Sequence, residues 1–264
     1  MIRAKLMMGA AVGFAGLVAN LIPGAHAFAA PKWKSGGGTT SGGTTSGGTT
    51  SGGTSTSSGT VLFSDGFESL PLGTGWLDGS VHGNWTSVYN GYGQNGIALD
   101  GTNVLSLSPA VSTTASTTHA GLVTSVPSFG DMDLKVQVRT VAQLRQPAPN
   151  PWEVGWVQWH YTDDNHFYYL ILKPNGWELG KEYLDSSGAQ NQQFLATGSS
   201  PTYPVGQWNK VEIKQVSNAI TVWANGTQLA TYTDTQNPYL KGVIGLYSED
   251  STVHFDNVQV SSAS

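Results

Sequence analysis

The stretch Trp156-Val-Gln-Trp-His-Tyr-Thr-Asp-Asp-Asn-His-Phe-Tyr-Tyr169 contains two runs of β-branched and aromatic residues on either side of Asp163-Asp164-Asn165. Such runs are typical of β-strands, and short Asp and Asn side chains hydrogen-bond local backbone amides in turns. We therefore expect an antiparallel hairpin with strands over Val154–Tyr161 and Phe167–Lys173.

Similar runs recur between Val61 and Val260, separated by segments rich in Gly, Asn and Asp. Asn225-Gly226 is a strong hairpin signal, because both residues tolerate the positive φ values of a type I′ turn. No segment shows a sustained helical period. The other clear strand candidates are Asp133–Arg139, Val211–Val216, Ala219–Ala224, Gln228–Tyr232, Gly242–Tyr247 and Val253–Val260. The pattern predicts an all-β fold, a two-sheet antiparallel β-sandwich.

The first 60 residues differ from the rest in composition. Arg3 and Lys5 precede an uncharged apolar run, and Ala25-His26-Ala27 offers a small-x-small cleavage site. We therefore expect a signal peptide over residues 1–27 and a secreted, cell-surface or periplasmic protein, with a retained N-terminal anchor as the alternative. Residues 35–60 are all Gly, Ser or Thr. Such a segment has no core, so residues 28–60 are expected to form a flexible linker or a dispensable tail, and 61–264 the domain.

Charge and cysteine content exclude several classes of function. The expected domain holds eight basic and 17 acidic residues, a formal charge of −9, and the chain has no Cys. A nucleic-acid-binding protein needs a basic face, so we expect no nucleic-acid partner. Disulfides, thiolate metal sites and a cysteine nucleophile are excluded. We further expect a monomer without an organic cofactor and, after removal of the signal peptide, without a membrane span.

Several stretches resemble a known group of β-sandwich proteins. They are Leu62–Glu68, Trp156–Tyr169, Gly206–Val211, Gly242–Tyr247 and His254–Val258. In this order they are similar to the concanavalin A-like lectin/glucanase jelly rolls, specifically the 3-keto-disaccharide hydrolase and family 16-like domains. The resemblance implies a jelly roll and a polysaccharide or oligosaccharide partner. It leaves enzymatic activity open, because the superfamily contains lectins, glycosidases, polysaccharide lyases and structural modules.

Alternation along the first strand of the hairpin suggests a sugar-binding face. Trp156, Gln158 and His160 should point one way, and the more apolar Val157, Trp159 and Tyr161 towards the core. An aromatic plane beside amide and imidazole groups suits a sugar ring and its hydroxyls. The alternative is a well-packed sheet with a hydrogen-bonded histidine. Other residues expected to line this groove are Trp152, Tyr168, Trp177 and Lys181.

Gln158-x-His160 also resembles the Gln-x-His element of alginate-lyase-type jelly rolls. That resemblance implies elimination, with Arg139 offsetting a uronate carboxylate and Tyr247 or Tyr168 as the acid/base. Neutralising the carboxylate makes the neighbouring carbon acid easier to deprotonate. The negative charge of the domain disfavours a highly anionic polymer, because long-range repulsion slows its approach.

Glu178 and Glu182 are candidates for hydrolysis. They resemble the Glu-x-Asp-x-Glu of family 16 glycosidases, with Gly180 in place of the middle Asp. A retaining glycosidase needs its two carboxyl groups about 5–5.5 Å apart. A regular strand would place these α-carbons ~13 Å apart, so convergence requires a bulge, which Gly180 permits, or inward-leaning side chains. The alternative is two solvent-exposed glutamates on an outer strand.

Calcium is the metal that the sequence suggests. The resemblance places Asp65 or Glu68 beside the closing strand that carries Asp256, and carboxylates with carbonyl oxygens suit this hard cation. The alternative is an Asp that caps a strand end. The domain histidines lack the spacing of a zinc site.

Three classes of function therefore remain open. The first is an exported domain that binds, and by elimination or hydrolysis cleaves, a polysaccharide in a groove on one sheet. The second is a non-catalytic lectin or adhesion module. The third is a purely structural sandwich.

Overall fold

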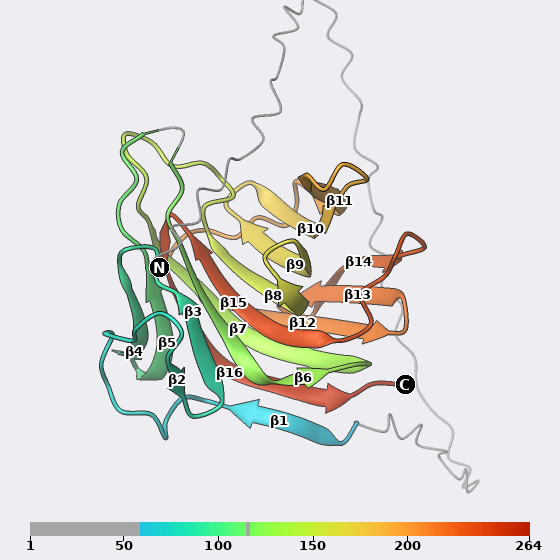
Figure 1. Ribbon diagram of the computed structural model, residues 1–264, viewed down its shortest axis with the longest axis horizontal. Helices are drawn as coiled ribbons and strands as arrows, with labels where there is room; N and C mark the ends of the chain where they lie inside the picture. The colour runs from blue at the N-terminus through green and yellow to red at the C-terminus, as the bar shows by residue number, and fades with distance from the viewer. Residues whose placement is uncertain (1–58, 115–116) are drawn as a thin grey trace, which may run out of the picture. The chain divides into compact units, whose positions relative to one another are not determined.

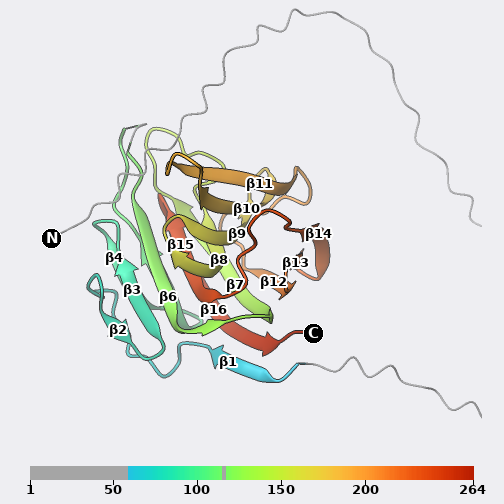
Figure 2. The same ribbon diagram turned by 45° about the vertical axis from the view of Figure 1, so that its right-hand side comes forward.

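The computed structural model describes residues 59–114 and 117–264. The expected signal peptide and nearly all of the expected linker lie outside these residues. Every regular element within the described ranges is a strand, and the strands form two antiparallel eight-stranded sheets (Figures 1 and 2). The prediction of an all-β, two-sheet jelly-roll sandwich is confirmed.

Sheet A is built around the long strands β7 and β16. In spatial order it contains β14 (Thr227–Thr233), β13 (Ala219–Ala224), β12 (Asn209–Val216), β7 (Met132–Gln143), β16 (Ser251–Ser262), β5 (Thr102–Ser108) and β4 (Gln94–Asp100), and β1 (Val61–Asp65) pairs with β16. The β13–β14 turn places Asn225 and Gly226 at φ 51° and 80°, as expected for this Asn-Gly hairpin.

Sheet B contains the hairpin predicted over Val154–Lys173. Its spatial order is β11 (Gln190–Gly198), β10 (Gly176–Leu184), β9 (His166–Lys173), β8 (Gly155–Asp163), β15 (Gly242–Glu249), β6 (Ala120–Phe129), β3 (Trp85–Tyr89) and β2 (Val81–His82). None of the described residues forms a helix long and apolar enough to cross a membrane.

The main core lies between the two sheets. Val157 and Trp159 of β8 face it, as predicted, and belong to the same core cluster as Leu134 and Val136 of β7. Trp159 donates a hydrogen bond of 2.7 Å from its indole nitrogen to Gln215 Oε1, so its buried polar atom has a partner. Complete burial of each such apolar side chain contributes about 1.5–3 kcal/mol.

Strand β8 is irregular after Trp159. Trp159 pairs with Tyr168, but the next paired residue is Asp163, and His160 has a φ of 48°. The left-handed residue breaks the alternation of the strand. Tyr161 therefore packs against the outer face of sheet B rather than in the core, which corrects its predicted position.

A second apolar cluster lies on the outer face of sheet B. Its aromatic members alternate with core residues along β8, β9 and β15, so their side chains point away from sheet A. They are Trp156, Phe167, Tyr169 and Tyr247. This face holds the candidate functional site.

Candidate functional site

Three aromatic side chains form the centre of the outer face of sheet B. The ring centroids of Trp156 and Tyr169 lie 4.5 Å apart, and those of Trp156 and Tyr247 lie 5.4 Å apart at 71°. The indole nitrogen of Trp156 donates to the carbonyl oxygen of Trp152, 3.1 Å away. Trp156, Tyr169 and Tyr247 are 6%, 0% and 2% exposed, so they mainly pack against one another, and the exposed edge of Trp156 is the part that a sugar ring can contact.

Glu178 of β10 is held beside these rings. The Tyr169 hydroxyl donates to Glu178 Oε1 over 2.8 Å, and Lys173 Nζ lies 2.8 Å from Glu178 Oε2. Gln192 Nε2 donates to the Tyr169 hydroxyl over 2.8 Å. Glu178 and Glu182 are only 7% and 8% exposed, so the alternative of two solvent-exposed glutamates is wrong.

Gly180 leaves room for Tyr169. The two residues pair across β9 and β10, and a methyl group at Gly180 would overlap the Tyr169 hydroxyl. Strand β10 runs in regular register against β9, and its irregularity against β11 falls between Leu179 and Gly180. Glu178 and Glu182 therefore stay on one face with a phenol between them, where the family 16 pattern has an aspartate. Burial, followed by the charges of Glu178 and Glu182, raises the pKa of Tyr169 well above its usual value.

The tip of the β8–β9 hairpin contributes a third carboxylate. The hydroxyls of Tyr89 and Tyr161 donate to Asp164 Oδ1 over 3.2 and 3.1 Å. Gln190 Nε2 connects the Asp164 carbonyl to Glu182 Oε2, at 3.1 Å from each. The sequence predicted Asp164 only as a turn residue. Tyr161 reaches it because the bulge at His160 turns that side chain outwards.

Glu249, at the end of β15, is a candidate site residue that was not predicted from the sequence. It lies two residues after Tyr247 and so on the same face. Burial, helped by the charges of Asp250 and Glu153, raises the pKa of its carboxyl to about 8. Glu249 is therefore largely protonated at pH 7. The alternation of Tyr247 and Glu249 was the one signal in the sequence that could have found it.

A buried ion cluster explains the electrostatics at Glu249. Arg145 forms ion pairs with Glu153 and Asp250 and donates to the carbonyl oxygen of Thr114 over 2.8 Å. One guanidinium faces three carboxyl groups, so burial of a third negative charge is unfavourable. Glu249 is the carboxyl group that becomes protonated, because the charge of Arg145 is already shared by Glu153 and Asp250.

Gln158 lies on the floor of the same face. It is 2% exposed, and its Oε1 has no hydrogen-bond partner among the described residues. Gly245, its neighbour on β15, leaves space for the amide, because a Cβ there would lie 2.6 Å from Gln158 Oε1. A buried acceptor without a donor costs about 1–3 kcal/mol.

The predicted convergence of Arg139, Gln158 and His160 does not occur. Arg139 belongs to β7 of sheet A, where its Nη1 lies 2.9 Å from both carboxylate oxygens of Asp100. The ring nitrogens of His160 lie 2.8 and 3.0 Å from the carbonyl oxygens of Tyr239 and Gly130, and burial lowers its pKa. The bulge directs this ring away from Trp156, so the Gln-x-His site is lost.

Three of the expected groove residues also lie elsewhere. Trp177 and Tyr168 pack in the core between the sheets. Lys181 is on the inner side of β10, where its ammonium lies 2.7 Å from Asp234 Oδ2. Trp152 is 45% exposed beside Trp156, and its role in binding stays a prediction.

The proposed calcium ligands each have protein partners. Asp65 accepts hydrogen bonds from Phe67 N and from the indole of Trp85, at 2.7 and 2.9 Å. Asp256 accepts from Asn257 N and Thr102 Oγ1, and burial, with the Glu68 charge, raises its pKa. No group of three or more metal-ligating side chains occurs in residues 59–114 and 117–264. These contacts match strand-end capping, and calcium stays a prediction.

This arrangement brings aromatic rings, amide groups and carboxyl groups together on one face of sheet B. Tyr247 lies within the electrostatic field of Glu249, Asp164 and Glu182, which with burial raise its pKa. A sugar lying across the rings would thus have carboxyl groups from both β10 and β15 near it. Proton donation from one and proton removal by another are the chemical steps that such a pair can perform.

Comparison with solved structures shows the fold. The family 16 glycoside hydrolase of the Bacteroides ovatus mixed-linkage glucan PUL, in complex with a G4G4G3G product, is 12% identical with a TM-score of 0.52, covering 75% of this chain and 99% of that one. The carbohydrate-binding module CBM66 from Bacillus subtilis is 14% identical with a TM-score of 0.50, over 68% and 96% of the two chains. A Bacillus subtilis protein with a galectin-like fold is 12% identical, with a TM-score of 0.50 over 77% and 96%.

Comparison of the sequence gives the family. No curated protein matches the chain. A family model for the 3-keto-α-glucoside-1,2-lyase-like domain matches residues 74–261, a range that includes every strand from β2 to β15 and nearly all of β16. The chain therefore belongs to the family of 3-keto-α-glucoside-1,2-lyase-like domains and is a carbohydrate-active jelly roll.

Proposed function

We propose that the outer face of sheet B binds a 3-keto-α-glucoside and that the chain eliminates its C1 substituent. The observation that carries this proposal is the position of two carboxyl groups, those of Glu249 and Glu182, whose charges both raise the pKa of Tyr247. The pKa of Glu249 is itself raised to about 8. The family description supplies the substrate class. The ring of the sugar lies beside Trp156, the most exposed of the three aromatic residues at the centre of this face.

The chemistry needs one base and one acid. A ketone at C3 makes the proton on C2 acidic, and Glu182 removes this proton. The C2–H electron pair forms the C1=C2 double bond as the C1–O1 bond breaks. Glu249 donates its proton to the leaving oxygen. The products are an alcohol and a conjugated 3-keto-glycal, and each carboxyl group has exchanged its protonation state.

The charges of the site favour a neutral sugar over a uronate. Two cations lie near the carboxyl groups of the outer face, and both are paired: Lys173 with Glu178, and Arg145 with Glu153 and Asp250. Arg139, which the alginate-lyase resemblance would use, lies on sheet A. A uronate carboxylate would thus meet Glu178, Glu182 and Asp164 without a free cation to offset it.

A direct assay follows the conjugated product. Methyl 3-keto-α-glucoside is incubated with the protein, and the ultraviolet absorbance of the enone and the released methanol are measured together. Glu182→Gln and Glu249→Gln should each reduce the rate by about 10²–10⁴-fold. Glu212→Gln on sheet A is the matched control and should keep the full rate. Absence of both products with the wild type would refute the elimination.

A non-catalytic binding module is the second candidate. The network of Lys173, Glu178, Tyr169 and Gln192 favours it, because every polar group in it is held by another, as in a rigid binding surface. This function predicts retention on a saccharide gel without any product. Hydrolysis would release a reducing sugar without the absorbance of the enone, so the same assay separates all three outcomes.

We also propose that the domain is exported. The composition of residues 1–27, with Arg3 and Lys5 before an apolar run and Ala25-His26-Ala27, supports this proposal. The N-terminal sequence and mass of the protein recovered from the medium or periplasm would test it. Cleavage after Ala27 is the expected result, and an intact Met1 would contradict it.

A further inference from the structure

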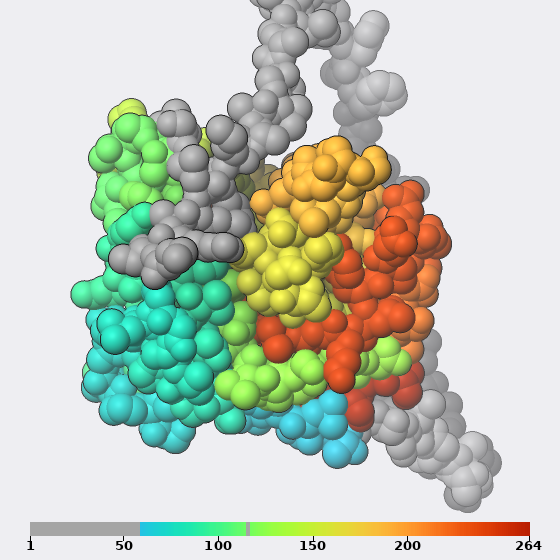
Figure 3. Space-filling model, in the orientation of Figure 1, coloured from blue at the N-terminus to red at the C-terminus, as the bar shows by residue number. Residues whose placement is uncertain are grey.

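A separate pocket lies on the opposite side of β10 from the candidate site. Alternation turns Lys181 and Tyr183 to the inner side of sheet B, and β14 is the last strand of sheet A. The hairpin tip (yellow), the β10–β11 hairpin (orange) and the segment after β14 (red) lie side by side around this region in Figure 3. The pocket has a volume of about 540 Å³, within the usual range for ligand sites.

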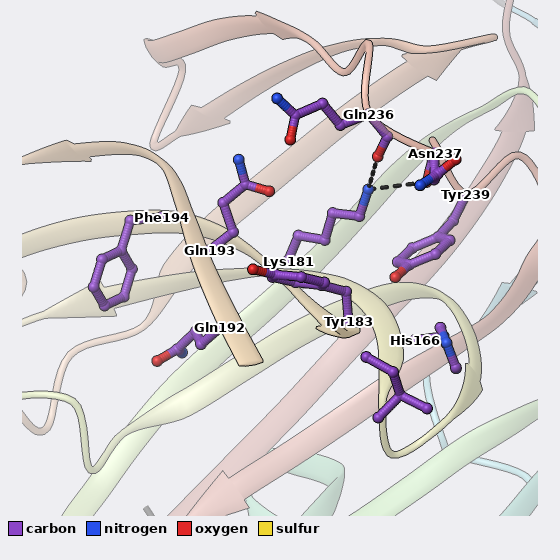
Figure 4. A pocket seen from close by; sticks show the side chains of 10 residues that line it. His166, Lys181, Tyr183, Gln192, Gln193, Phe194, Gln236, Asn237 and Tyr239 are labelled. Carbon is purple, nitrogen blue, oxygen red and sulfur yellow. Dashed lines mark hydrogen bonds between the residues drawn. The ribbon is translucent and has the colours of Figure 1, made fainter. Parts of the chain in front are cut away.

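The base of the pocket is rigid. Lys181 Nζ lies 2.7 Å from Asp234 Oδ2 and donates to the carbonyl oxygens of Gln236 and Asn237 over 2.6 and 2.9 Å (Figure 4). An ammonium group has three donors, and all three are used. Burial disfavours the charge of Asp234, but hydrogen bonds from Lys181 and Tyr168 outweigh it and lower the pKa of Asp234. Lys181 is therefore a structural support.

The rim of the pocket offers amide groups for recognition. Gln193 comes from β11, and Gln236 and Asn237 come from the segment after β14. Within residues 59–114 and 117–264, no hydrogen bond uses the side-chain amide of any of these three residues. In Figure 4 the amide ends of Gln193 and Gln236 lie on the same side of the Lys181 side chain. Each amide supplies two donors and one acceptor.

Tyr183 supplies an aromatic surface in the same pocket. It is half-buried and lies next to Lys181 in Figure 4. The ring of Tyr239 is less available, because Lys181 Nζ lies 4.7 Å from its centroid and the His166 ring lies 5.9 Å away at 85°. Tyr183 and Phe194, which is 59% exposed, are thus the rings that remain for a ligand to contact.

We infer that this pocket is a second saccharide site, which holds a neutral pyranose against Tyr183 and hydrogen-bonds it through Gln193, Gln236 and Asn237. Aromatic surface next to amide groups matches the apolar face and the hydroxyl groups of a sugar. A charged ligand fits less well. The Lys181 charge is already matched by Asp234, so neither an anion nor a cation finds an opposite charge that is free.

The two sites use opposite faces of one strand. Glu178 and Glu182 point to the outer face of β10, whereas Lys181 and Tyr183 point to the inner face. A variant in the pocket therefore leaves the aromatic centre around Trp156 in place. Gln192 lines the pocket and also bonds Tyr169 on the outer face, so the variants that test the pocket are made at Tyr183, Gln193 and Gln236 instead.

Affinity electrophoresis tests the inference. The probes are four neutral polysaccharides cast in separate gels: pullulan, mixed-linkage β-glucan, xyloglucan and galactomannan. The variants are Gln193→Ala/Gln236→Ala and Tyr183→Ala, with Gln207→Ala as a matched control on an exposed loop. Trp156→Ala reports on the outer face. Thermal unfolding of each variant checks that the fold is kept.

We expect the pocket variants to lose at least about tenfold in affinity for one polysaccharide, the equivalent of one or two lost hydrogen bonds. Gln207→Ala should bind each polysaccharide with the affinity of the wild type. Trp156→Ala should keep the share of that affinity that the pocket contributes. Equal migration of the pocket variants and the wild type in all four gels overturns the inference, as does a wild type that none of the gels retards. The enone assay reports on the outer face alone, so failure of one proposal is distinguishable from failure of the other.

Discussion

Tyr169 connects three parts of sheet B through one hydroxyl group. It donates to Glu178 on β10 and accepts from Gln192 on β11, while its ring lies against Trp156 on β8. The hydroxyl thus fixes the orientation of a carboxylate in the candidate site. Hydrogen bonds to charged groups contribute about 1.5–3 kcal/mol, more than those between neutral groups.

Tyr169→Phe should therefore reduce the free energy of unfolding by about 1.5–3 kcal/mol. Urea denaturation gives this value. Tyr203→Phe is the matched control, because the Tyr203 hydroxyl is buried and has no hydrogen-bond partner in the part of the chain that the structure describes, so its removal should be neutral or stabilising. Equal destabilisation by the two variants would contradict the role given to the Tyr169 hydroxyl.

Glu249 should make activity and stability depend on pH. Its carboxyl must be protonated to act as an acid, so the rate should fall as the pH rises through about 8. The folded protein holds this proton up to about pH 8, whereas an unfolded glutamic acid loses it near the ordinary pKa of 4.5. Stability from this group is therefore full below about pH 4.5 and decreases as the pH rises to about 8.

Glu249→Gln is the variant that tests this assignment. In this variant the rate should no longer fall as the pH rises through about 8. The stability should also no longer decrease between about pH 5 and 8 to the extent that Glu249 causes in the wild type. Rates and urea midpoints measured across this range check it. A pH profile identical to that of the wild type would show that another group titrates there.

At the scale of elements, β8 and β10 show what a strand pattern can predict. Alternation correctly placed Trp156 and Gln158 opposite Val157 and Trp159, because that part of β8 is regular. It placed His160 wrongly, because a histidine at φ 48° leaves no sign in the sequence. A bulge depends on contacts with neighbouring strands, which the pattern of one strand does not contain.

Gly180→Ala should disturb the site through Tyr169. The added methyl group overlaps the Tyr169 hydroxyl, so the ring must move and its hydrogen bond to Glu178 is lost. We expect a loss of about 1–3 kcal/mol in stability and weaker saccharide binding. Gly188→Ala is the comparison variant. Gly188 has a φ of 80° and open space around it, so this alanine introduces backbone strain without steric overlap. Unchanged binding by Gly180→Ala would contradict this packing.

At the scale of the whole molecule, the strands rich in β-branched and aromatic residues were predictable, and the long-range polar contacts were not. The sequence gives few clues to β4 and β6, because Gly96 and Pro127 interrupt them. Lys181 and its partner Asp234 are 53 residues apart in the sequence, and the topology of the sheets is what brings them together. For the same reason the separation of Arg139 from Gln158 appears only when the sheets are assembled.

Arg145 joins three distant segments at one end of the sandwich. It holds Glu153 and Asp250 and donates to the Thr114 carbonyl. Arg145→Met would leave two buried carboxylates without their cation, which costs about 3–5 kcal/mol. Lys135→Met removes an exposed pair on sheet A and should cost less than about 1 kcal/mol. Chemical denaturation compares the two, and similar losses would argue against a buried cluster.

The central claim is that a saccharide binds on the outer face of sheet B. Nuclear magnetic resonance of the indole N–H groups tests it most directly, with methyl 3-keto-α-glucoside added to Glu249→Gln to suppress turnover. The Trp156 indole lies in the candidate site, whereas those of Trp159 and Trp177 lie in the core. The account predicts that the Trp156 signal shifts with saturable concentration dependence while the Trp159 and Trp177 signals stay in place. A Trp156 signal that does not move under conditions in which the sugar binds would contradict it.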